Sequence, residues 1–172
     1  YMFGTILIGL SIANFLYGFG HYYEISIYEQ TGREAAVALI RFIIILIAGR
    51  VLPFFTSKKC PDLKINVPKT LSPICLFLTG SLVLIAFINV PIWLESILLA
   101  SCAIFNFIRL LYWKPNKILS FPMLWILHIG ILFIILSMAM EIWAIYWPVL
   151  NFTKATLHLV LVGGLGVIGI GF

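Results

Sequence analysis

Charged side chains are scarce in this sequence. They make up 10% of its 172 residues, whereas about 25% is usual in a soluble domain. Apolar residue types account for 63% of the chain, and the mean hydropathy is +1.14. The polar side chains are too few to cover a water-soluble globule of this size, and intrinsic disorder requires low hydrophobicity. Both of these classes are therefore excluded.

Cysteine is equally sparse, and the common motifs of soluble enzymes are missing. None of the three cysteines stands in a CxxC spacing, which argues against a disulfide framework or a structural zinc site. The chain also lacks P-loop, GxSxG and HExxH motifs, and we assign no catalytic residue. The net charge of +5 does not come from a continuous basic face that would follow a phosphate backbone, so we expect no nucleic-acid partner.

What the sequence does contain is a series of long apolar runs. A helix needs about 20 apolar residues to cross the hydrocarbon core, and we assign six spans, over residues 1–20, 34–55, 71–89, 92–113, 121–147 and 154–172. Prolines such as Pro53 are expected to mark helix ends. We therefore predict an all-α integral membrane bundle of about six transmembrane helices, which forms a single domain over residues 1–172 in the lipid bilayer.

The segments that connect these runs differ in charge. Several lysines lie between residues 58 and 69, and Lys114 and Lys117 lie in the fourth connection, whereas the first connection carries glutamates between residues 24 and 34. Loops rich in Lys and Arg stay in the cytoplasm, which predicts a cytoplasmic N-terminus. Because both chain ends fall inside apolar runs, we expect a part of a longer protein, completed by its remaining helices or by a second copy.

Ionisable side chains within the runs are the candidates for a functional site, because they are costly in a bilayer and usually face protein, a cofactor or water. These residues, with His21 at the outer end of the first run, are Arg41, Arg50, Glu95, Arg109, His128, Glu141 and His158. We expect Arg50 and Arg109 to extend toward the headgroups, and Glu95 and Glu141 to be solvated. For Arg41, two interpretations stay open: it binds an acidic group, or it extends to the headgroups.

The histidines lie at different predicted depths. His158 lies about 6 Å below the outer boundary and His128 about 10 Å above the inner one, at 1.5 Å per residue. In a hydrocarbon core about 30 Å thick, about 14 Å of depth separates them, which is too far for one metal ion, whereas His21 and His158 both lie toward the outer side. The alternative role for each histidine is a hydrogen bond to a neighbouring helix.

The last run carries glycines below His158. Gly163, Gly166 and Gly169 recur at every third position, and such a face lets another surface approach the helix closely. Two interpretations stay open: close packing of a neighbouring helix, or contact with the edge of a flat haem ring.

Three blocks of sequence occur in order along the chain. The first is GRVLPFFT at residues 49–56. The second combines NFIR at 106–109, WKP at 113–115 and LWILHIG at 124–130. The third is LHLVLVGGLG at 157–166. Together these blocks, spread over most of residues 14 to 169, resemble the signatures of the NnrS family.

The resemblance implies a multi-pass protein of the bacterial inner membrane that carries haem and copper and is linked to nitric oxide and nitrosative stress. Family members have about twice as many spans as this chain. On the matching positions, His128 and His158 are the preferred metal ligands, His21 is a third, and Arg50 and Arg41 are basic candidates for cofactor binding, Arg50 by pairing with a haem propionate. For Cu(I), which prefers sulfur, the candidates are Met138, Met140 and Cys102.

Two other functions are compatible with the residues. A transporter or channel module would line a polar route with His and Arg side chains. A structural half-bundle would serve only to dock onto further helices. The haem and copper protein is the leading hypothesis.

Overall fold

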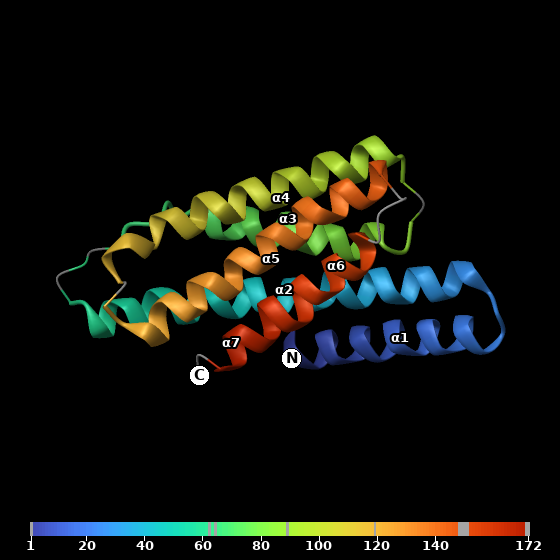
Figure 1. The fold of residues 1–172 in the computed structure, drawn as a ribbon, viewed down its shortest axis with the longest axis horizontal. Helices are drawn as coiled ribbons and strands as arrows, with labels where there is room; N and C mark the ends of the chain where they lie inside the picture. Colours follow the sequence, from blue (N-terminus) through green and yellow to red (C-terminus); the bar gives the residue numbers. More distant parts are fainter. Residues whose placement is uncertain are drawn as a thin grey trace.

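The computed structural model describes residues 2–61, 63, 65–88, 90–118, 120–147 and 152–170, with side chains from residue 4 onward. These residues form a helical bundle without strands (Figure 1). Its elements are α1 (Met2–Tyr22), α2 (Ser26–Lys59), α3 (Leu71–Ile85), α4 (Ile92–Tyr112), the short 3-10 helix η1 (Pro115–Lys117), α5 (Pro122–Tyr146), α6 (Phe152–His158), the π-helical segment η2 (Leu159–Gly166) and α7 (Val167–Ile170). The predicted all-α membrane bundle is confirmed.

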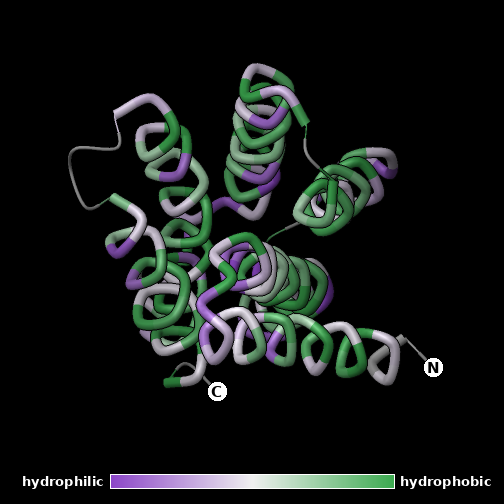
Figure 2. Tube along the Cα trace, turned by 90° about the vertical axis from the view of Figure 1, so that its right-hand side faces the viewer, coloured by the Kyte–Doolittle hydropathy of each residue, from purple (hydrophilic) through white to green (hydrophobic). Residues whose placement is uncertain are grey.

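Four helices form the centre of the bundle. α2 packs against α3, α3 against α4, α4 against α5, and α5 against α2. α1 lies along α2, and the continuous rod of α6, η2 and α7 lies along α5 (Figures 1 and 2). Buried side chains such as Ile45, Leu99 and Ile134 fill the space between the central helices. Apolar residues also run along the outer helices (Figure 2), as expected where helices face lipid.

The helices differ in their capacity to span a bilayer. Four described stretches are long and apolar enough to cross a membrane, namely Ser26–Lys59, Ile92–Lys117, Pro122–Tyr146 and Phe152–Ile170. α3 has 15 residues, or about 22 Å, which is less than a hydrocarbon core of about 30 Å. The third run thus forms a helix shorter than the predicted 71–89. The predicted span ends at residues 1, 89 and 172 lie outside the described residues.

α2 extends beyond the predicted limits of 34–55 at both ends. It has 34 residues and is about 51 Å long, because the turn after α1 is short and the helix begins at Ser26. Pro53 lies inside α2 instead of ending it. Proline removes one backbone hydrogen bond, but apolar surroundings favour keeping all the others, so the helix continues to Lys59.

The two ends of the bundle carry opposite charge. The connections after α2 and α4 lie at one end (Figure 1), which we call the lysine end, defined by Lys58, Lys59, Lys69, Lys114 and Lys117. The turn after α1 and the C-terminal ends of α3 and α5 lie at the other, the glutamate end, defined by Glu24, Glu29, Glu34, Glu95 and Glu141. Loops rich in lysine stay in the cytoplasm, so the cytoplasmic side is predicted to be the lysine end.

Candidate functional site

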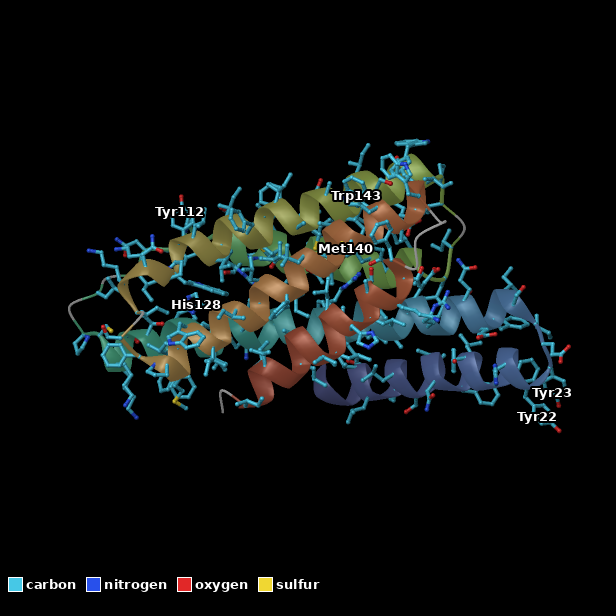
Figure 3. The ribbon with its side chains drawn as sticks, viewed as in Figure 1. Tyr22, Tyr23, Tyr112, His128, Met140 and Trp143 are labelled. Atoms are coloured by element: carbon cyan, nitrogen blue, oxygen red, sulfur yellow. The ribbon has the colours of Figure 1, made fainter. Side chains whose placement is uncertain are left out.

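His128 lies in the first two turns of α5, near the lysine end (Figure 3). Its side chain is buried, and its Nδ1 lies 2.9 Å from the carbonyl oxygen of Leu124, one turn earlier. A carbonyl only accepts hydrogen bonds, so Nδ1 carries the proton and Nε2 keeps its lone pair. Nε2 is buried and has no hydrogen-bond partner among the described residues. His128 therefore offers one unused nitrogen ligand in a dry environment.

His158 has the same local hydrogen bond but a different environment. It is the last residue of α6, and its Nδ1 lies 2.9 Å from the carbonyl oxygen of Lys154. The side chain is exposed on the outside of the described bundle. The π-helical segment η2 begins at the next residue, and such segments are rare and often occur at functional sites. Because Nδ1 is engaged by Lys154, Nε2 is the ring nitrogen of His158 that is open on the outer surface of the bundle.

His21 stands apart from the other two histidines. It is exposed at the end of α1, where its Nδ1 lies 3.9 Å from Glu29 and its ring stacks on Tyr17. Each of the three histidines therefore has its own set of neighbours. In the part of the chain that the structure describes, no group of three or more His, Cys, Asp and Glu side chains is placed to hold a metal ion.

Two glycines of the last run, Gly163 and Gly164, pack against α5. A Cβ atom added at Gly163 would lie 2.6 Å from Cγ of Phe133, and one at Gly164 would lie 2.2 Å from Cδ1 of Ile134. From the opposite side, a Cβ at Gly130 of α5 would lie 2.4 Å from Ile168. Side chains of the neighbouring helix therefore fill this face at Gly163 and Gly164. Helix packing accounts for Gly163 and Gly164. At Gly166 and Gly169, which are exposed, an added Cβ would meet no atom of a neighbouring helix within 4 Å, so both interpretations stay open for these two positions.

Arg109 of α4 does not extend to the headgroups as expected. It is 1% exposed, and its Nη2 donates to the carbonyl oxygen of Ile45 at 3.2 Å and to Oδ1 of Asn106 at 3.0 Å. Its guanidinium carbon lies 5.0 Å from the centre of the Trp113 ring. No acidic side chain pairs with it in the described part of the chain. Arg109 lies on the inner face of α4. Its cation is therefore surrounded by the Ile45 carbonyl, the Asn106 amide and the face of the Trp113 ring.

Trp113 connects Arg109 to His128. Its side chain is buried, with Arg109 over the ring and the His128 ring edge-on at 6.1 Å between centroids. Asn106 extends the same face of α4 by donating to the carbonyl oxygen of Cys102 at 2.9 Å. The helical spacing of positions 102, 106, 109 and 113 was the available sequence signal, since residues three and four apart share one face. This spacing is typical of side chains that lie on one face of a helix, and we call the inner face of α4 formed by these four residues the polar stripe.

Arg41 of α2 binds an acidic group, so that alternative for its role is correct. The side chain is 2% exposed. Its Nε donates to Oγ of Ser137 at 3.1 Å, and its Nη1 forms an ion pair with Glu141 of α5. Glu141 is therefore not simply solvated as expected. No local sequence signal indicated this pair, because its two residues lie 100 positions apart.

The remaining candidate residues are Arg50 and the sulfur-containing side chains. Arg50 is exposed on α2, as expected for a side chain that extends to the headgroups. Met138 and Cys102 are fully buried. The Cys102 sulfur lies 3.2 Å from Oγ1 of Thr79 and 3.6 Å from Nδ2 of Asn106. These contacts place Cys102 on the same inner face of α4 as Asn106 and Arg109.

The family model described as “NnrS protein” matches residues 1–172. No curated protein and no solved structure matches the chain.

Proposed function

Because this chain belongs to the NnrS family, we propose that it is a haem- and copper-binding protein of the nitric oxide response, embedded in the bacterial inner membrane. In this proposal His128 and His158 each supply one metal ligand. The observation that carries it is the buried Nε2 of His128, which has no partner among the described residues.

The hydrogen bonds of the two imidazoles suit metal ligation. A histidine that binds a metal usually donates its other ring N–H to a carbonyl or carboxylate, which fixes the tautomer and the orientation of the ring. The bonds from His128 to Leu124 and from His158 to Lys154 do this. Trp113, held between Arg109 and His128, limits the rotation of the His128 ring and excludes water from it.

His128 and His158 each fit the role of a single metal ligand, but the described residues do not form a complete metal site. His128 is buried at the lysine end of α5, and His158 is exposed at the start of the π-helical segment. Further ligands would come from other helices of a longer chain or from a second copy. A bound haem or copper ion would supply an open coordination position for nitric oxide. In this proposal Arg50, which is exposed on α2, pairs with a haem propionate, whereas Arg41 is already engaged by Glu141 and Ser137.

Visible absorption spectra and metal analysis of the purified full-length protein test this proposal. We expect a Soret band and bound copper in the wild type, and the loss of one or the other in His128→Gln and in His158→Gln. His21→Gln is the matched control, because this exposed histidine lies beside Glu29 and Tyr17 and is not one of the two ligands in this proposal, and it should retain both. A folded, colourless and metal-free wild type would contradict the proposal, as would unchanged haem and copper in both variants.

A transporter or channel module is the second candidate. It is favoured by one observation, a polar cavity of about 470 Å³ that reaches Arg41 from the glutamate end. Transport of a solute by metal-free protein in liposomes would favour this function over the first.

A further inference from the structure

Two adjoining cavities open at the glutamate end. α2, α3, α4 and α5 line the larger one, and α2, α4, α5 and α6 line the smaller one. Their volumes are about 470 and 220 Å³. Both are lined by Glu34 of α2, Glu95 of α4 and Glu141 of α5. We call the two cavities together the vestibule. They are large enough for several water molecules, since one water occupies about 30 Å³ of liquid.

The charges that face the vestibule do not balance. The charged groups in its lining are Arg33, Arg41, Glu34, Glu95 and Glu141, and α3 and α6 contribute none among the described residues. Arg41 is paired with Glu141. Neither Glu34 nor Glu95 has a cation within ion-pair distance among the described residues. Glu34 accepts a hydrogen bond from Nε2 of Gln30 at 2.7 Å. With two arginines against three glutamates, the lining has one excess negative charge.

Two buried polar atoms at the vestibule also need partners. Nη2 of Arg41 and Oγ1 of Thr156 have no hydrogen-bond partner among the described residues, although these residues are only 2% and 5% exposed. Arg41 borders the larger cavity and Thr156 the smaller one. Buried polar groups are almost always satisfied by protein or water, and a guanidinium N–H requires an acceptor. Water inside the vestibule supplies one.

We propose that the vestibule is a water-filled proton-binding site in which Glu34 and Glu95 share one bound proton. Two ionised carboxylates that face one cavity repel each other, and one proton removes the repulsion. Glu34, Glu95 and Glu141 all line both cavities, so their carboxylates face the same small volume. Glu141 is engaged by the guanidinium of Arg41 in an ion pair, so Glu34 and Glu95 are the two carboxylates that take up the proton. The proton comes from bulk water and forms an O–H bond at one carboxylate, with no electron transferred.

This site does not depend on metal binding, because none of its residues is a proposed metal ligand. Infrared spectroscopy of the purified full-length protein tests it through the carbonyl stretch of a protonated carboxyl group. At neutral pH we expect this band in the wild type and its loss on raising the pH. Glu95→Gln and Glu34→Gln should each lose the band at neutral pH, because the remaining carboxylate no longer has the other beside it. Glu24→Gln, an exposed glutamate outside the vestibule, should retain it.

Labelling of the wild type with dicyclohexylcarbodiimide, which reacts with protonated carboxyl groups, gives a second readout without any substitution. Mass spectrometry should locate the label on Glu95 or Glu34, with less label as the pH rises. The proposal is overturned if both variants keep the infrared band, if the wild type has none, or if neither glutamate is labelled.

Discussion

The two buried arginines of the bundle are stabilised in different ways. Arg41, toward the glutamate end, is 2% exposed and has a formal counter-ion in Glu141. Arg109, toward the lysine end, is 1% exposed and relies on the carbonyl of Ile45, the amide of Asn106 and the face of Trp113. One guanidinium thus belongs to an ion pair beside a polar cavity, and the other lies among neutral dipoles in dry surroundings.

This difference teaches that burial of a cation in a membrane bundle does not require an acidic partner. A guanidinium has five donors and is more weakly hydrated than an ammonium group. For Arg109, two acceptors and an aromatic ring stand in for a carboxylate, although its Nε has no hydrogen-bond partner among the described residues. The ion pair, in contrast, places two charges in one small region. Removal of one of them should therefore cost more than removal of one dipole.

The largest effect is expected for Glu141→Ala. It leaves the Arg41 guanidinium buried without its counter-ion, and loss of one partner of a buried ion pair is strongly destabilising, here by about 3 kcal/mol. The double variant Arg41→Met with Glu141→Leu should recover most of this loss, because no charge stays behind. Thermal unfolding in detergent, followed by circular dichroism, measures both. A single variant as stable as the wild type would show that the pair does not hold Arg41 in place.

A smaller effect is expected for Asn106→Ala, which removes one acceptor from Arg109. Loss of a hydrogen bond to a charged group costs about 2 kcal/mol. Asn106→Asp should cost less than Asn106→Ala, because it gives Arg109 a counter-ion and makes it resemble Arg41. Asn14→Ala, at an exposed position of α1, is the control and should change stability by about 0.5 kcal/mol at most. Equal loss for the alanine and aspartate variants would contradict the role given to the Asn106 oxygen.

The smallest effect is expected for Gly49→Ala. A Cβ there would lie 3.1 Å from Nη1 of Arg109, whereas a Cβ at Gly18 would meet nothing within 4 Å. Gly18→Ala should gain about 0.5–1 kcal/mol from its greater helix propensity. Gly49→Ala should gain nothing, because the guanidinium must move away from its acceptors. The same gain in both variants would show that the space around Arg109 is not tight.

Helix positions could be predicted well where apolar runs and helices coincide. The predicted runs 92–113 and 121–147 agree with α4 and α5, which end at Tyr112 and Tyr146. The start of α2 was not predictable in this way. Hydropathy identifies the part of a helix that is apolar enough to lie in lipid, and a helix can extend beyond that part. Ser26–Arg33 is polar and still helical, since its charges face water or the vestibule.

The site was only partly predictable. His128 stood out in the sequence because an imidazole is rare in an apolar run, and its burial with a free Nε2 makes it the strongest candidate ligand. Arg109 looked like a residue that extends to the headgroups, because its distance along the helix from the lysine end says nothing about which side of the helix faces protein. The Arg41–Glu141 pair depends on α2 and α5 being neighbours, which neither segment reveals by itself.

The amino-acid sequence alone determined that this chain is a helical membrane protein, because hydropathy and chain length act locally and the bilayer leaves few other structures for such segments. It also determined the family through its ordered motifs. Only the tertiary structure decided which polar side chains meet. Contacts such as those between Arg41 and Glu141, or between Trp113 and His128, arise from the rotation and packing of whole helices, and the free energy that orients a helix is summed over all of its neighbours.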